Sequence, residues 1–139
     1  MRLELYEAEC QRIAQECGAM LNEAKALFAT PGRVLTPLEQ GGVLHALQIL
    51  IENAIGKAKH SLKAAGADVP VSAYDAFAAM AHHKLISQND LPQWNAIVGL
   101  RNRIVHDYMN VDMAQIAAIV QDDRYAFLID FLQNPIHAP

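Results

Sequence analysis

The sequence predicts an all-α protein, arranged as a five-helix up-and-down bundle. Apolar residues recur at alternating steps of three and four along the chain, as one face of a packed helix requires. Helix-start signals divide this periodicity into five segments, and no segment shows the period of two that is typical of a strand. The segments are joined by short loops, which favour antiparallel neighbours in a bundle.

The first helix is expected to start at Leu3 and to carry both cysteines. Its inward face is predicted by the positions that keep the three-four spacing: Leu3, Tyr6, Cys10, Ile13, Cys17, Met20, Ala24 and Leu27. Cys10 and Cys17 lie roughly 10 Å apart along a helix axis, which is too far for a disulfide between them. We therefore expect reduced thiols in the core.

The second helix has a complete start signal. Thr36 can cap it, Pro37 suits the first helical position, and Glu39 completes a capping box with Thr36. Glycine is a common helix terminator, so the helix is expected to stop near Gly66. Its predicted apolar face is Leu47, Leu50, Ile51, Ala54, Ile55, Ala58 and Leu62.

Three further starts are predicted at Ser72, Asp90 and Asp112, and Asn134-Pro135 ends the last helix. The third helix is predicted to bury Tyr74, Phe77, Ala81 and Leu85. The fifth helix is predicted to run unbroken and to direct inward Met113, Ile116, Val120, Phe127 and Phe131.

Length and charge limit the classes of protein that fit. A chain of 139 residues is most simply one domain, residues 1–139, which can bury about two thirds of its unfolded surface. No apolar run approaches the roughly 18 residues that cross a bilayer, and the first residues lack the apolar block of a signal peptide. We expect a soluble cytoplasmic protein. The net charge of −4 argues against a general polyanion-binding surface, so any nucleic-acid chemistry must rest on a local site.

The fourth helix carries an arginine where its periodicity calls for an apolar side chain. The stripe reads Trp94, Ile97, Arg101, Ile104 and Tyr108. A buried guanidinium needs a partner, because an unpaired buried charge costs several kcal/mol. That partner can be an acid within the bundle, for which Glu52 is the candidate, a cluster of carbonyl groups, or an anion from outside.

His106 lies about 140° around the helix from Arg101, on a polar face with Asn102, Arg103 and Asn110. On one straight helix, the side chains of Arg101 and His106 cannot bind the same group. They converge if the helix ends or kinks between them, or if a second subunit crosses nearby. Taken alone, His106 also fits a solvated surface histidine.

The segment from Arg101 to Tyr108, RNRIVHDY, resembles the Arg, four spacers, His, any residue, Tyr motif of the HepT toxins. These toxins belong to the HEPN superfamily of ribonucleases and pair with antitoxins in the HepT/MntA toxin-antitoxin family. The similarity extends through IVGLRNRIVHDYMNVD and HALQILIENAIGKAKH and spans roughly residues 36–133.

The resemblance implies an RNA-cleaving toxin that is a homodimer and needs neither metal nor cofactor. In such an enzyme a neighbouring 2′-hydroxyl attacks the phosphate, with Arg101 stabilising the charge and His106 moving the proton. Asn102 fits the polar residue after the motif arginine and, with Arg103, is a candidate for substrate binding. A homodimer would bring two copies of Arg101 and His106 to one cleft.

Tyr108 resembles the tyrosine to which MntA, a minimal nucleotidyltransferase antitoxin, attaches AMP. Added phosphates beside Arg101 would occupy the anion site and repel RNA. The alternative for Tyr108 is a half-buried residue that closes the apolar stripe.

For the whole protein, the alternative is a non-catalytic HEPN-like binding module that assists a nucleotidyltransferase. The histidines and cysteines show no metal-ligand spacing, so no metal site is expected.

Overall fold

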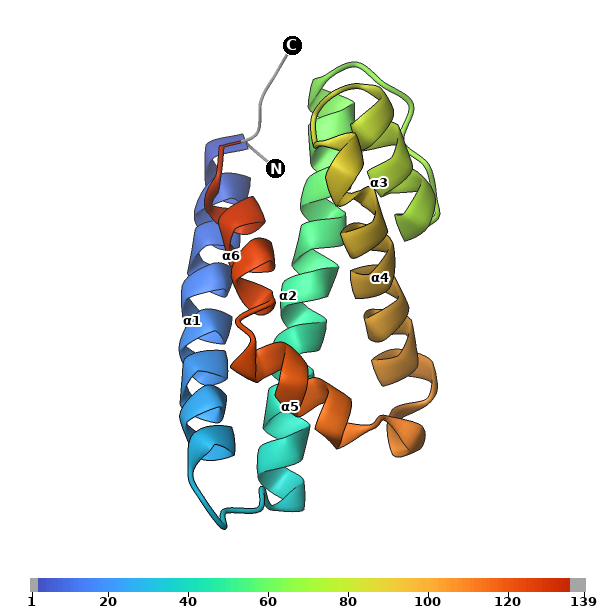
Figure 1. Ribbon diagram of the computed structural model, residues 1–139. Helices are drawn as coiled ribbons and strands as arrows, with labels where there is room; N and C mark the ends of the chain where they lie inside the picture. Colours follow the sequence, from blue (N-terminus) through green and yellow to red (C-terminus); the bar gives the residue numbers. More distant parts are fainter. Residues whose placement is uncertain (1–2, 136–139) are drawn as a thin grey trace.

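The computed structural model describes residues 3–135, so both ends of the expected 1–139 domain lie outside it, as does the side chain of Leu3. This part of the chain holds helices and no strands (Figure 1), which confirms the all-α prediction. The α-helices are α1 (Leu3–Ala29), α2 (Pro37–Ala64), α3 (Ala73–His82), α4 (Leu91–His106), α5 (Met113–Gln121) and α6 (Tyr125–Gln133). Single 3-10 turns, η1 (Gln88–Asp90) and η2 (Tyr108–Asn110), flank α4.

The predicted starts of α2, α3 and α5 are confirmed by their caps. Thr36 and Glu39 form the full capping box, with Pro37 in the first turn. Ser72 accepts a hydrogen bond from the backbone N–H of Asp75, and Asp112 accepts one from Ala114. Each cap satisfies an N–H group that the helix itself leaves unpaired, so the sequence fixes these starts locally.

The expected fifth helix is in fact two, so the count of five helices is wrong. The backbone reverses at Asp123, which has a φ of 56°. The N–H of Asp123 donates to the carbonyl of Val120, and that of Arg124 donates to Ile119, in the pattern that closes a helix end. Asp123 also forms a 2.7 Å ion pair with Lys25 of α1. Periodicity continues across the break because α6 resumes on the same side of the core.

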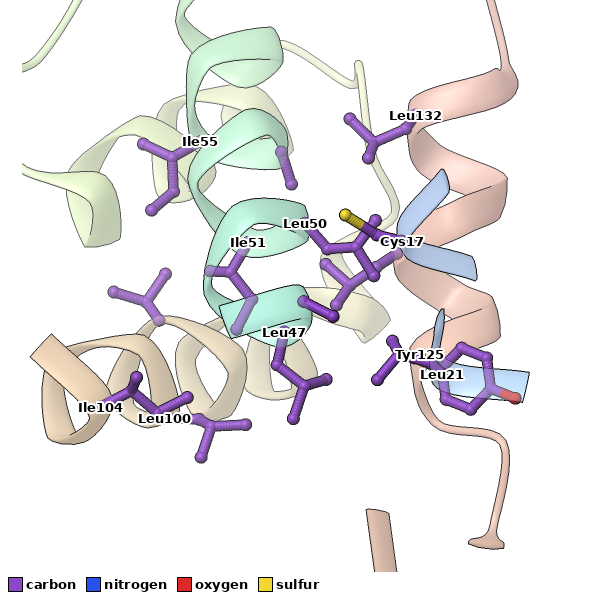
Figure 2. Packing of buried hydrophobic residues seen from close by; sticks show 14 of the residues in the cluster. Cys17, Leu21, Leu47, Leu50, Ile51, Ile55, Leu100, Ile104, Tyr125 and Leu132 are labelled. Carbon is purple, nitrogen blue, oxygen red and sulfur yellow. The ribbon is translucent and has the colours of Figure 1, made fainter. Parts of the chain in front are cut away.

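The core surrounds α2, which contacts α1, α3, α4 and α6. Figure 2 shows side chains of α2 directed toward both α4 and α6. At the other end of the bundle, the indole of Trp94 lies 4.2 Å from the ring of Phe77 and 4.7 Å from that of Phe127. This packing fixes α4 against α2 and α3 on one side and α6 on the other.

Two residues predicted to face inward are exposed. Met20 is 41% exposed because the buried face of α1 follows Ala14 and Leu21, a drift expected of a 3.6-residue helix. Tyr74 is also 41% exposed, since Ala73 and Phe77 fill the core side of α3. Both cysteines are buried and free, as predicted.

Lys57 is a buried cation that the sequence reasoning did not identify. Its side chain is 3% exposed, and its ammonium donates to the backbone carbonyls of Phe131 and Asn134 at the end of α6. Burial lowers the pKa of this ammonium. Cations near a helix C-terminus compensate its unpaired carbonyls, so Lys57 fastens the end of α6 to α2.

Replacing Lys57 by Met should destabilise the fold by about 1–3 kcal/mol, because two carbonyl oxygens lose a charged hydrogen-bond donor while the apolar stem remains. Urea denaturation measures this change. Lys63→Met on the exposed side of α2 is the matched control and should shift stability by less than about 0.5 kcal/mol. Equal stability of the two variants would contradict the role of Lys57.

Candidate functional site

The helix that carries the motif arginine and histidine ends directly after the histidine. Asp107 leaves the helical region with a φ of −143° and a ψ of 43°, while its N–H still donates to the carbonyl of Arg103 at 2.9 Å. The side chain of Asn110 then donates to Asp107 at 2.7 Å and stabilises the turn η2. Arg101 and His106 therefore share one helix.

Because α4 neither ends nor kinks between Arg101 and His106, the angle of about 140° between them persists within one chain. Val105 and Asn102 occupy the positions between the two. His106 and Val105 are exposed, and Asn102 and Arg101 are partly buried. These four residues, here called the motif face, form one continuous surface on the last turns of α4.

Arg101 sits beside the core without an internal partner. Its neighbours Leu100 and Ile104 are 6% and 2% exposed and point into the apolar interior (Figure 2). The Nε atom of Arg101 is buried and has no hydrogen-bond partner within the described part of the chain. A buried donor without a protein partner costs free energy, which makes Arg101 the candidate residue for binding a group from outside the chain.

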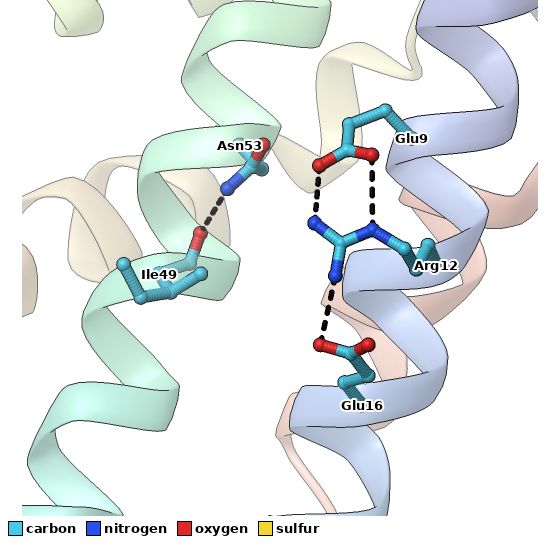
Figure 3. A network of polar contacts seen from close by, with 5 residues as sticks. All are labelled: Glu9, Arg12, Glu16, Ile49 and Asn53. Carbon is cyan, nitrogen blue, oxygen red and sulfur yellow. Dashed lines mark hydrogen bonds and ion pairs between the residues drawn. The ribbon is translucent and has the colours of Figure 1, made fainter.

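The alternative in which Glu52 pairs with Arg101 is wrong. Glu52 is exposed and accepts a 3.0 Å hydrogen bond from Gln48 on its own helix. Arg12 on α1 provides a contrast, because its guanidinium donates hydrogen bonds to the carboxylates of Glu9 and Glu16, the latter at 2.9 Å (Figure 3). In residues 3–135, no carboxylate forms such a pair with Arg101.

Tyr108 does not lie on the same helix as Arg101, which corrects the prediction that both share one helical face. The tyrosine belongs to η2, beyond the end of α4, and its side chain is 50% exposed. Its hydroxyl rests against Gly41 in the second turn of α2, where a β-carbon would lie 3.3 Å from the oxygen. Sequence reasoning missed Gly41, since its role depends on a contact between distant segments.

Arg103 lies outside the motif face, next to its His106 edge. It is exposed about 160° around α4 from Arg101 but only about 60° from His106, and it lines a cavity of about 420 Å³ between α4, α5 and α6. The structure therefore brings Arg101, Asn102 and His106 onto one surface, with Arg103 beyond the edge that His106 forms.

The described residues, 3–135, show neither a metal-binding cluster nor a membrane-spanning helix. No group of three His, Cys, Asp or Glu side chains gathers there as a metal ion would require. None of the helices in this range is both long and apolar enough to span a membrane.

The fold and the motif define the class of protein as an α-helical domain of the HEPN type. More particularly, the chain belongs to the ribonuclease HepT-like family, whose model matches residues 12–134. It is 33% identical over 82 residues to the mRNA nuclease HepT of Shewanella oneidensis. That match covers 59% of this chain and 62% of the relative, so it spans less than two thirds of the relative's length.

Two solved structures share the fold. One is a toxin-antitoxin complex with AMP-PNP, with a TM-score of 0.78, 23% identity, and coverage of 91% of this chain and 97% of that chain. The other is a tri-AMPylated HEPN toxin of Shewanella oneidensis in complex with an MNT antitoxin, with a TM-score of 0.77 and 23% identity. It covers 92% of this chain and 96% of that chain.

Replacing Arg101 by Met should leave the free energy of unfolding unchanged or raise it by up to about 1 kcal/mol. The substitution keeps the apolar stem and removes a buried nitrogen that has no partner. Urea denaturation of the Arg101→Met and Glu52→Gln variants provides the measurement. A loss of several kcal/mol in the arginine variant would indicate an internal ion pair after all.

Proposed function

We propose that this protein is the toxin of a toxin-antitoxin pair, a single-domain cytoplasmic endoribonuclease that cleaves RNA without a metal ion. The observation that carries the proposal is the buried, unpartnered Nε of Arg101 on the same surface as an exposed histidine. A guanidinium with no internal acid is available to hold a phosphate. Membership of the ribonuclease HepT-like family supports the same chemistry.

Cleavage follows from the residue types on the motif face. The ribose 2′-hydroxyl attacks the adjacent phosphorus and loses its proton to a base, while the bond from phosphorus to the 5′-oxygen breaks. The leaving oxygen takes up a proton, so the products are a 2′,3′-cyclic phosphate and a 5′-hydroxyl. His106 can carry out either proton transfer, and Arg101 stabilises the negative charge on the phosphate. Asn102, between them, contacts the substrate.

The site is completed by a second copy of the chain. In-line transfer benefits from a base and an acid on opposite sides of the phosphate, whereas each motif face offers one histidine. Within a chain, Arg101 and His106 also diverge by about 140°. A homodimer in which two motif faces meet supplies both histidines and both arginines to one phosphate. Val105, which is 41% exposed between them, is the apolar contact around which such faces can pack.

The purified protein, freed of any antitoxin, should cut RNA in excess EDTA and leave 2′,3′-cyclic phosphate ends. Arg101→Ala and His106→Ala should each lose the activity by a factor of at least about 100, the range of general acid-base catalysis. His83→Ala and Arg12→Ala, which alter the same residue types far from the motif face, are the matched controls and should cut normally.

Equal cleavage by all five proteins would identify a contaminating nuclease. Absence of cleavage by the unsubstituted chain, with Tyr108 unmodified by mass spectrometry, would favour the non-catalytic binding module.

We further propose that a minimal nucleotidyltransferase antitoxin silences the toxin by transferring AMP to Tyr108. Tyr108 lies on the turn η2, shortly after His106, and its hydroxyl rests against Gly41 of α2. The tyrosine side chain is 50% exposed to solvent. Phosphates attached there would add negative charge beside the motif face and repel RNA. The tri-AMPylated HEPN toxin with a similar fold supports this form of control.

Incubation with the cognate nucleotidyltransferase and ATP should add the mass of AMP to a peptide that contains Tyr108 and abolish cleavage. Tyr108→Phe lacks the acceptor oxygen, so it should stay unmodified and active under the same treatment. Tyr74→Phe removes the hydroxyl of another tyrosine that is 41% exposed, and it should be modified normally. Peptide mass spectrometry and the cleavage assay decide between the sites, and modification of Tyr108→Phe would refute the assignment.

A further inference from the structure

A groove runs along the side of α4 that carries Arg103. It lies between α4, α5 and α6, above α2, and encloses about 420 Å³, a volume typical of ligand sites. Its apolar lining comes from all four helices and includes Leu47, Ile51, Ile97, Leu100, Ile119 and Leu128. In Figure 1, α5 is inclined to the other helices and does not run alongside α4.

The polar lining of this groove is cationic, although the protein carries a net charge of −4. Arg103 and Arg124 lie along it with three carboxamide side chains, and its lining includes no carboxylate. Both arginines are exposed. Arg124 forms an ion pair with Asp122 at 3.8 Å, and both side chains are largely exposed. Such an exposed pair contributes little to stability, so it leaves Arg124 available to a ligand.

Resting on the function proposed above, we propose that this groove binds a single-stranded stretch of the RNA substrate that flanks the cleavage position. Unstacked bases gain free energy against an apolar surface, carboxamides hydrogen-bond base edges, and arginines contact phosphates. The groove offers these three elements together. A negatively charged chain with apolar faces is the occupant that its lining complements.

The position of Arg103 connects this groove to the cleavage chemistry. Arg103 lies two residues after Arg101 and three before His106 on α4, yet it faces about 160° away from Arg101. RNA cut at the motif face can therefore reach the groove by passing around the end of α4. The groove then selects the flanking nucleotides and contributes to affinity, while the bond cleavage itself depends on Arg101 and His106.

Ala96 allows a direct test because it is an exposed residue of α4 that lines the groove. Ala96→Glu adds a carboxylate to the groove that Arg103 and Arg124 line. Ala26→Glu adds the same charge to the exposed side of α1. Both are made in the His106→Ala chain, and binding of a fluorescent single-stranded RNA of mixed sequence is followed by anisotropy. We expect at least tenfold weaker binding with Ala96→Glu and an unchanged affinity with Ala26→Glu.

Arg124→Gln tests the electrostatic part and has Lys63→Gln as its charge-matched control. The loss of one phosphate contact should lower the slope of log affinity against log salt by about one for Arg124→Gln and leave it unchanged for Lys63→Gln. In chains with an intact His106, both Ala96→Glu and Arg124→Gln should raise KM and preserve kcat. Circular dichroism and thermal melts verify that each variant is folded.

Equal RNA affinity of Ala96→Glu and Ala26→Glu would overturn the proposal. So would a change from dimer to monomer with Ala96→Glu, which would make the groove a contact between copies of the chain. Loss of antitoxin binding with full retention of RNA affinity would assign the groove to the protein partner and would also overturn it. Because the anisotropy measurement requires no cleavage, it decides on the groove even if the unsubstituted chain proves not to be a nuclease.

Discussion

The packing of α2 against four other helices is the constraint on which the positions of the candidate functional residues depend. Leu47, Leu50 and Ile51 are at most 1% exposed, and they lie where α2 meets both α4 and α6. Since Leu100 and Ile104 fill the side of α4 that faces this core, the remaining sides of its last turns must face solvent. The orientation of Arg101, Asn102 and His106 is thus set by apolar contacts, and no polar contact to these residues is needed to establish it.

Local signals were sufficient where a helix start depends on its own neighbours. The capping box of Thr36 and Glu39 and the cap of Asp112 could be predicted because each is complete within four residues. The break at Asp123 could not, since aspartate adopts positive φ less readily than glycine and its ion pair with Lys25 joins distant segments. The burial of Lys57 was missed for the same reason: the carbonyls that accept its hydrogen bonds lie on α6.

The candidate site was predictable to the extent that it depends on one helix. Spacing alone indicated that Arg101 interrupts an apolar stripe and that His106 lies on another side, and the structure agrees. Spacing could not choose between Glu52 and an external anion, because that choice depends on where a side chain of α2 points. It also placed Tyr108 on α4, since nothing in the segment RNRIVHDY signals that the helix ends at His106.

In the proposed function, the end of α4 would serve two purposes through two parts of its surface. The motif face presents a guanidinium whose Nε is buried near the core, where a lower effective dielectric would strengthen an interaction with a phosphate. Arg103, which lies beyond the His106 edge of that face, is exposed to water, so in this proposal it would attract RNA without strongly stabilising a transition state. The proposed nuclease would thus need few cations despite its net charge of −4, because the arginine assigned to the reacting phosphate is partly buried and the others would only guide the strand.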